Sequence, residues 1–258
     1  MIAEVNGISL NYDDEGEGEP VLLIAGFGSN RHFWKGMVPL LEGCRLIMPD
    51  NRGVGKTVYS GPFTMEDLAD DCYELVRSLG LEKVHVVGWY MGSLIAQVFA
   101  AKHPEATKTL TMVSTYVHRP ARSAYMLENM VQLAIDGKAT LDALYVAVNA
   151  FCYPEHVFRD YEQKGIAVPV PRRPMDPRQL MDQLRAVDGF RATDVISKIT
   201  APSMVVQGTA DMMTDFSEGE AVYSHIKGCK IVPVMGEGHN VPPEEYYRDL
   251  LTLIRDNS

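Results

Sequence analysis

The stretch Gly88-Trp89-Tyr90-Met91-Gly92 decides how the whole chain is interpreted. Residues 84–87 before it have the pattern of a buried strand, and residues 93–100 after it have that of a helix. A Gly-x-x-x-Gly frame between a strand and a helix is typical of a turn that presents a nucleophile. Its two glycines are needed because the turn is so sharp that side chains there would collide with neighbouring backbone. The frame therefore predicts a strand, a sharp turn and a helix, with tyrosine where serine is usual.

The composition is that of an ordinary globular protein. The 258 residues are 46% apolar and 22% charged, which suffices for one large core with an insertion. The first residues lack a basic start and an apolar run, and no segment approaches the roughly 20 apolar residues of a membrane span. A net charge of −10 repels phosphate and anionic lipid. We expect a cytoplasmic protein that binds a small molecule and neither nucleic acid nor membrane; its oligomeric state is unknown from the sequence.

The cysteines and histidines do not indicate a metal or a cofactor. The four cysteines, at positions 44, 72, 152 and 229, have no Cys-x-x-Cys spacing, which favours buried free thiols. The histidines other than His239 form no pair at helical or strand spacing that would bind zinc. We expect a protein with no metal and no cofactor.

Short apolar segments alternate with amphipathic ones along most of the chain. Residues 1–12 alternate like a strand pair around Asn6-Gly7, and an acidic turn then leads into the apolar run 21–24. Further strands are predicted at 45–48, 83–87, 109–113, 203–207 and 230–234. Helices are predicted at 34–42, 65–79, 92–103, 217–226 and 242–255. This alternation predicts an α/β fold with a mostly parallel, doubly wound sheet.

The alternation breaks between residues 118 and 198, where helical patterns occur without a convincing strand. Helices are predicted at 121–135, 140–151 and 177–187, with a stiff, extended proline-rich link at 168–174. We interpret 118–198 as a helical lid over the carboxyl edge of the sheet, and 1–117 and 199–258 as the core. Some apolar lid residues are candidates for lining a pocket, although each of them could instead only pack the lid helices together. These candidates are Tyr125, Met126, Met130, Leu133, Leu144, Tyr145, Val148, Phe151 and Tyr153.

Two polar residues follow late strands. Asp211 comes just after the predicted strand 203–207, and His239 comes just after 230–234. Acyl transfer needs a nucleophile, a histidine that moves its proton and a carboxylate that orients the histidine. We therefore take Tyr90, Asp211 and His239 as candidate catalytic residues. The competing interpretations are a structural histidine and an aspartate that only forms a turn.

The sequence resembles the α/β-hydrolase fold superfamily over nearly its whole length, in particular the lidded branch of enol-lactone hydrolases, carbon–carbon bond hydrolases and small esterases. The resemblance is carried by residues 25–28, 50–55, 88–92, 211 and 238–239, in that chain order. It implies an oxyanion hole formed by the backbone N–H groups of Phe27 and Met91, with Asp211 and His239 as orienting acid and base. Backbone donors do not depend on side-chain identity, so they can survive a change at position 90.

Residues 50–57 end in Gly55-Lys56-Thr57, which imitates the end of a phosphate-binding loop. The first glycine of that motif would fall on Asp50, whose carboxylate would repel phosphate. The resemblance to the α/β-hydrolase superfamily instead implies a structural glycine turn beside the active site.

A tyrosine at the apex changes the expected chemistry. A phenol is only about 0.1% ionised at pH 7, so Tyr90 would need a base to act as a nucleophile. Its oxygen also lies about 6.5 Å from Cα, against about 2.4 Å for serine, from standard bond lengths. The hydroxyl should reach into the pocket or pass His239, and a carbonyl in the oxyanion hole would meet the ring. Serine-type acyl transfer is therefore not expected. Ser93, the nearest later hydroxyl, is expected to face the helix packing.

Four hypotheses remain open. In the first, Tyr90 donates a proton or hydrogen bond to a substrate carbonyl or enolate, with His239 and Asp211 as the base pair of a lyase, isomerase or cyclase. In the second, His239 activates water to hydrolyse an ester, lactone or dicarbonyl. In the third, the protein binds a ligand without turnover. In the fourth, Tyr90 replaces the serine of an ordinary esterase or lactonase.

Overall fold

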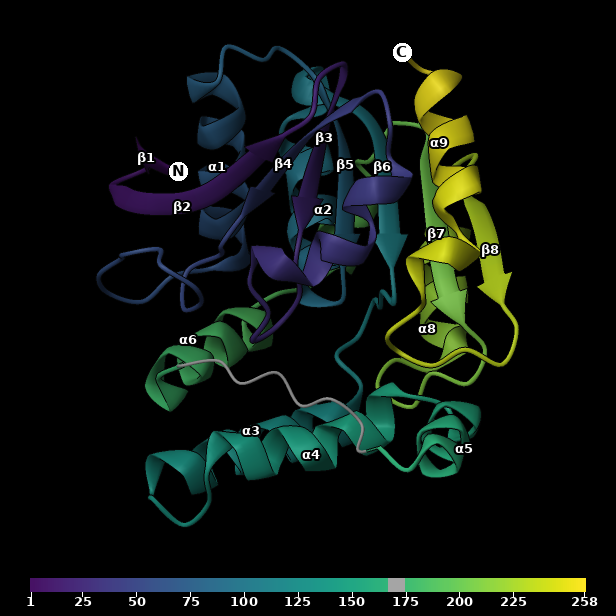
Figure 1. Ribbon diagram of the computed structural model, residues 1–258. Coiled ribbons are helices and arrows are strands. Elements are labelled where there is room, and N and C mark those ends of the chain that lie inside the picture. Colours follow the sequence, from purple (N-terminus) through teal and green to yellow (C-terminus); the bar gives the residue numbers. More distant parts are fainter. Residues whose placement is uncertain (167–174) are drawn as a thin grey trace.

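The structure is a computed structural model that describes residues 1–166 and 175–258 (Figure 1). Within these residues the strands form one eight-stranded sheet in the order β1-β2-β4-β3-β5-β6-β7-β8. The pairs β1/β2 and β2/β4 are antiparallel, and all later pairs are parallel. The α/β fold with a mostly parallel sheet is thus as predicted. The strands are β1 (Ile2–Val5), β2 (Ile8–Glu15), β3 (Glu19–Ile24), β4 (Cys44–Pro49), β5 (Val84–Trp89), β6 (Thr107–Val113), β7 (Ser203–Gly208) and β8 (Lys230–Val234).

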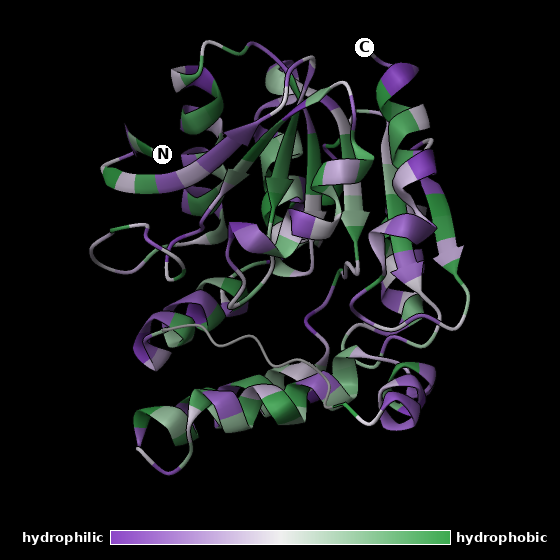
Figure 2. Cartoon of the chain, viewed as in Figure 1, coloured by the Kyte–Doolittle hydropathy of each residue, from purple (hydrophilic) through white to green (hydrophobic). Residues whose placement is uncertain are grey.

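The centre of the sheet forms the core. All six residues of β5 are buried, as are the last four of β3, because parallel central strands are covered on both faces. Figure 2 shows hydrophobic residues along these central strands. Helix α2 (Met91–Lys102) is buried over its first ten residues and packs on β5, β6 and α1 (Met65–Ser78). The turn between β5 and α2 is therefore held from both sides.

The remaining core helices lie close to their predicted positions. They are α8 (Phe216–His225) and, within the segment predicted at 242–255, the 3₁₀ turn η4 (Pro243–Glu245) followed by α9 (Tyr247–Arg255). The 3₁₀ turn η3 (Pro104–Ala106) was not predicted. The α-helix predicted for 34–42 is wrong: the chain forms two 3₁₀ helices, η1 (Arg31–Gly36) and η2 (Val38–Leu40). Gly36 ends the first, and Pro39, which lacks an N–H, sits inside the second.

Between β6 and β7 the chain forms a set of helices that we call the inserted helices. They are α3 (Ala121–Ile135), α4 (Leu141–Cys152), α5 (Glu155–Lys164), α6 (Pro177–Asp188) and α7 (Thr193–Ile196). In Figure 1, α3 to α6 lie beyond the carboxyl ends of the parallel strands. The sequence patterns found α3, α4 and α6 but missed the four-residue α7 and also α5. Helix α5 is hydrophilic over most of its surface (Figure 2) and has no buried residue. The predicted link 168–174 lies outside the described residues.

None of the helices in the two described ranges is long and apolar enough to cross a membrane.

Candidate active site

Tyr90 lies at a sharp turn between β5 and α2. Its backbone has φ 53° and ψ −117°, a conformation that non-glycine residues rarely adopt and that costs about 1–3 kcal/mol. The glycines on either side permit the turn. A Cβ on Gly88 would lie 2.2 Å from the carbonyl oxygen of Gly92, and a Cβ on Gly92 would lie 2.1 Å from that of Ile24. Both positions therefore exclude any larger residue, as the sequence frame implied.

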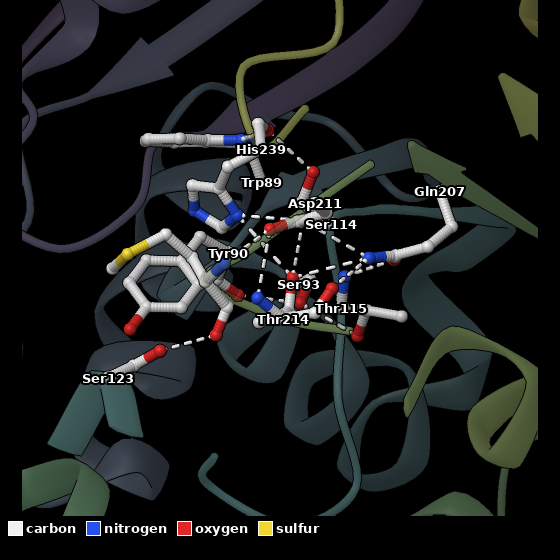
Figure 3. A network of polar contacts seen from close by, with 11 residues as sticks. Trp89, Tyr90, Ser93, Ser114, Thr115, Ser123, Gln207, Asp211, Thr214 and His239 are labelled. Atoms are coloured by element: carbon white, nitrogen blue, oxygen red, sulfur yellow. Dashed lines mark hydrogen bonds and ion pairs between the residues drawn. The ribbon is translucent and has the colours of Figure 1, made fainter. Parts of the chain in front are cut away.

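Asp211 and His239 are brought together from the ends of two neighbouring strands. Their Oδ2 and Nδ1 atoms are 2.9 Å apart, and both side chains are buried (Figure 3). Asp211 Oδ1 accepts hydrogen bonds from the amides of Met213 and Thr214 at 2.8 and 2.9 Å. Its Oδ2 accepts from the Thr214 hydroxyl at 2.6 Å and from the Gln207 amide at 3.2 Å. These four hydrogen bonds fix the carboxylate independently of its contact with the imidazole.

The charge state of Asp211 follows from these contacts. Burial acts to raise the pKa of this carboxyl, but the opposing effects of His239 and of the hydrogen bonds from His239 and Thr214 outweigh it, so the pKa is lowered. An ionised Asp211 requires a proton on Nδ1 of His239. In the neutral imidazole with this tautomer, Nε2 carries the lone pair of a base.

The backbone of His239 is also fixed, by residues that the sequence did not identify. Trp89 Nε1 and Ser114 Oγ both donate to the His239 carbonyl oxygen, at 3.1 and 2.7 Å. The amide of Asn240 donates to the carbonyl of Cys152 at the end of α4, at 3.1 Å. These contacts join β5, the loop after β6 and the inserted helices to the histidine. They pair residues more than 80 positions apart, which no local pattern could reveal.

The side chain of Tyr90 lies beside the imidazole instead of bonding to its base nitrogen. The two ring centres are 4.6 Å apart at an interplanar angle of 86° (Figure 3). His239 Nε2 is buried and has no hydrogen-bond partner in the described part of the chain. Within residues 1–166 and 175–258 the Tyr90 hydroxyl donates to no protein group either, and burial raises the pKa of the phenol. Tyr90 is thus a neutral phenol, and in this arrangement water does not reach Nε2.

A cavity of about 490 Å³ opens in front of Tyr90 and His239. The predicted pocket residues Met130, Leu144, Tyr145, Val148 and Tyr153 line it. The expectation was wrong for the other four. Tyr125 and Leu133 are 74% and 40% exposed, because they face solvent from α3. Met126 and Phe151 instead pack, partly buried, against the hydrophobic core.

The other wall of the cavity comes from the core of the protein and is rich in aromatic rings. Phe33 of η1 stacks on Trp89, with ring centres 4.0 Å apart and planes 17° apart. Trp34 and Tyr246 extend this wall. Among the described residues that line the cavity there is no lysine, arginine, aspartate or glutamate. Burial, together with the charges of Arg31 and Lys35, lowers the pKa of His32 in the wall. The wall is therefore suited to an uncharged, largely apolar ligand.

The two candidate oxyanion-hole amides follow the carboxyl ends of β3 and β5, one in a loop and one at the start of a helix. Phe27 lines the cavity from a turn that is closed by a 3.1 Å hydrogen bond from Ser29 N to the carbonyl oxygen of Gly26. Met91 is the first residue of α2, so its N–H has no acceptor inside the helix. Met91 itself is fully buried, and its side chain does not line the cavity.

Two further predictions can be compared with the structure. Ser93 is fully buried, with Oγ 2.6 Å from the Tyr90 carbonyl oxygen and 2.9 Å from Thr115 Oγ1, so it faces the helix packing. The carboxylate of Asp50 accepts hydrogen bonds from Asn11, Arg31 and the amide of Lys56. The loop 50–57 is thus a closed structural turn whose acid is already paired.

No group of three or more histidine, cysteine, aspartate or glutamate residues in the described ranges is placed to hold a metal ion. All four cysteines are buried free thiols.

Comparison with known proteins defines the family. A family profile described as alpha/beta hydrolase fold matches residues 19–226. The chain is 30% identical to Lipase 3 of Moraxella sp. (strain TA144) over 248 residues, which cover 92% of this chain and 76% of that protein. The chain therefore belongs to the α/β-hydrolase family of enzymes.

Solved structures agree with this assignment. A thermophilic esterase from Thermogutta terrifontis superimposes with a TM-score of 0.81 at 27% identity, covering 99% of this chain and 97% of that one. The enol-lactonase from Burkholderia xenovorans LB400 gives a TM-score of 0.86 at 21% identity and covers 99% of this chain and 100% of the other, which shows a shared fold.

Proposed function

We propose that this α/β-hydrolase-family protein acts on a small, uncharged, largely apolar carbonyl compound such as an ester, lactone or dicarbonyl. Its chemistry is proton transfer or activation of water by the Asp211–His239 pair, with Tyr90 holding the carbonyl oxygen, and not acyl transfer through residue 90. The observation that carries the proposal is a paired Asp211–His239 beside a neutral Tyr90 phenol at the wall of an apolar cavity. We further propose that the inserted helices act as a lid over this cavity.

The neutral state of Tyr90 supports a role as donor. A phenol whose pKa is raised keeps its proton at neutral pH, so it donates a hydrogen bond to a carbonyl or enolate oxygen and is a poor nucleophile. Its hydroxyl has no acceptor in the described part of the protein, which leaves it available to a ligand. An enolate held in this way would be stabilised, and its proton would pass to or from His239 once Nε2, which is buried in this arrangement, becomes accessible.

One observation favours a second candidate. His239 Nε2 is buried and unpartnered, at the place where a serine hydroxyl would donate its proton. The protein would then bind a carbonyl ligand without turnover, because the ring of Tyr90 occupies the position of the nucleophile in this hydrolase fold. A serine at position 90 would restore ester hydrolysis in that case.

Five proteins separate these functions: the unaltered chain, Tyr90→Phe, Tyr90→Ser, His239→Ala and Tyr116→Phe. Tyr116 is the matched control, because it is a buried tyrosine whose ring centre is 5.7 Å from that of Tyr90 and which does not line the cavity. Hydrolysis is measured with phenyl acetate and an aryl lactone. Proton transfer is measured with benzoylacetone in D₂O, as deuterium uptake at the carbon between the carbonyls.

The proposal predicts turnover or exchange by the unaltered chain that falls at least about 100-fold in His239→Ala and is unchanged in Tyr116→Phe. If the activity of Tyr90→Phe falls as much as that of His239→Ala, the Tyr90 hydroxyl takes part in the reaction. If Tyr90→Phe keeps full activity, the reaction proceeds through water activated by His239. Turnover that survives in His239→Ala contradicts both forms of the proposal. Activity found only in Tyr90→Ser supports the second candidate.

A further inference from the structure

Gln183 of the inserted helix α6 is fully buried, and both ends of its side-chain amide are in use. Its Oε1 accepts a hydrogen bond from the amide of Gly28 at 3.0 Å. Its Nε2 donates to the carbonyl oxygen of Arg52 at 2.7 Å. One side chain of an inserted helix therefore binds two core loops, the loop after β3 and the loop after β4.

The helix lies unusually close to these loops, and glycine makes the approach possible. A Cβ on Gly53 would lie 2.9 Å from the carbonyl oxygen of Gln179 and 3.3 Å from Cγ of Gln183. A Cβ on Gly28 would lie 2.8 Å from the hydroxyl oxygen of Tyr145 in α4 and 3.4 Å, an ordinary contact distance, from a methyl group of Leu180 in α6. Both glycines have positive φ, 89° and 61°, which other residues rarely adopt. The contact between α6 and the loops is thus a defined packing arrangement and not a chance approach of a long side chain.

The contact acts on the peptide next to a candidate oxyanion donor. The Gly28 N–H belongs to the planar peptide unit that begins with the carbonyl of Phe27, so holding it fixes the orientation of that plane. On the other side of Phe27, Asn51 Nδ2 donates to the Ala25 carbonyl at 2.8 Å. The turn itself is closed by the bond from Ser29 N to the Gly26 carbonyl. The Phe27 backbone is therefore held from both directions, and Gln183 holds it from an inserted helix.

We propose that Gln183 is a positioning residue, which aims the Phe27 N–H at the carbonyl oxygen of a bound ligand and so couples the placement of α6 to the oxyanion hole. The role rests on the proposed function, because it needs a carbonyl ligand in the cavity. Gln183 does not line the cavity, so it acts only through the backbone that it holds.

The test compares Gln183→Leu and Gln183→Glu with Gln179→Leu in the full chain. Gln183→Leu removes both hydrogen bonds, whereas Gln183→Glu keeps the acceptor for Gly28 N–H and loses the donor to Arg52. Gln179 is the matched control, since it lies one turn earlier on α6 and has no side-chain hydrogen bond in the described ranges. The first measurement is hydrogen exchange of the Gly28 amide by NMR. The second is the change in the Phe27 amide resonance when benzoylacetone is added.

We expect Gly28 exchange to become at least about tenfold faster in Gln183→Leu and to stay slow in Gln183→Glu and Gln179→Leu. The Phe27 resonance should respond to benzoylacetone in the unaltered chain, in Gln183→Glu and in Gln179→Leu, and lose most of that response in Gln183→Leu. Equal exchange and equal response in Gln183→Leu and the unaltered chain would overturn the inference alone. No Phe27 response in the unaltered chain would overturn the proposed function and, with it, this role of Gln183.

Discussion

At the scale of single residues, the site combines a strained position with an unusually well-supported acid. Tyr90 keeps a backbone conformation with φ 53°, although a tyrosine gains nothing from it in isolation. Asp211 receives four hydrogen bonds besides its contact with His239. Such support is expected where a carboxylate must remain ionised while buried, because an unpaired buried charge is costly.

Asp211→Asn tests how much the hydrogen bonds to this carboxylate contribute to the stability of the fold. Each oxygen of the carboxylate accepts from at least two donors. In the asparagine variant an NH₂ group, itself a donor, takes the place of one oxygen and faces those donors without an acceptor between them. We expect a loss of about 2–4 kcal/mol in the free energy of unfolding at pH 7, measured by urea denaturation. Asp215→Asn makes the same change four residues later, at an exposed side chain without a cap hydrogen bond, and should cost less than about 0.5 kcal/mol.

The stability difference between the unaltered protein and Asp211→Asn should change with pH in one direction. The pKa of Asp211 is lower in the folded protein than in the unfolded chain. The stability that its ionisation provides is therefore present above the unfolded value of about 3.9 and is lost as the pH falls through the folded value. The gap between the unaltered protein and Asp211→Asn should narrow below about pH 4. A gap that stays constant from pH 7 to pH 3 would show that the charge of Asp211 plays no part.

Sequence patterns identified the residues with distinctive chemistry but not their supports. Asp211 and His239 could be found because each follows a predicted strand in a fixed order along the chain. Ser114 and Gln207 could not, because a polar residue that bonds to a distant group leaves no periodicity in the sequence. Their hydrogen bonds to the His239 carbonyl and the Thr115 amide join segments that only the folded sheet brings together (Figure 3).

At the scale of the element, the unit that matters is β5, the turn and α2. The turn brings the start of α2 so close to β3 that a Cβ on Gly92 would overlap the carbonyls of Ile24 and Ala25, at 2.1 and 2.7 Å. The chain cannot relax there, since α2 is also packed on β5, β6 and α1. The two glycines thus determine where the helix starts.

Gly92→Ala should therefore cost more than about 3 kcal/mol of unfolding free energy, or prevent folding, because the added methyl meets rigid backbone. Gly189→Ala is the control at the end of α6. There φ is −74° and the nearest atom to an added Cβ is 3.8 Å away. That substitution should be neutral or stabilise by up to about 1 kcal/mol. Thermal and urea unfolding of both variants would decide the matter, and a mild effect of Gly92→Ala would refute the steric account of the turn.

The elements themselves were predictable where burial imposes a strict pattern. Central strands such as β5 and β7 are mostly apolar and are buried at every position, and helices α1 and α3 have clear periodicity. Failures occurred where burial is weak or where the chain is interrupted. Helix α5 buries none of its residues, and a proline and a glycine break the segment around η1 and η2 into 3₁₀ turns.

At the scale of the whole molecule, a buried histidine links stability to pH. His85 lies in β5 with its side chain fully buried, and Nδ1 is 2.9 Å from Thr109 Oγ1. Burial, assisted by the charge of Lys108, lowers its pKa to about 4. The unfolded chain takes up a proton near pH 6.5 while the folded protein does not, so stability falls as the pH drops from about 6.5 towards 4.

His85→Val should remove this contribution, which amounts to at most about 3 kcal/mol over that interval. Urea denaturation gives the free energy of unfolding at pH 7.5 and at pH 4.5. Between these two pH values it should fall less in His85→Val than in the unaltered protein. Thr109→Val is the control, since it removes the hydrogen bond but keeps the imidazole, and its pH dependence should match that of the unaltered protein. If His85→Val loses stability with falling pH as steeply as the unaltered protein, the acid sensitivity comes from other residues.

The turn at Tyr90 also has an evolutionary consequence. Tyrosine codons UAU and UAC become serine codons UCU and UCC through a change of the middle base alone. The backbone strain, the two glycines and the Asp211–His239 pair are all in place before such a change. A gene that encodes this protein therefore stands a single point mutation away from serine, aspartate and histidine at these three positions, and that change would need no rebuilding of the fold.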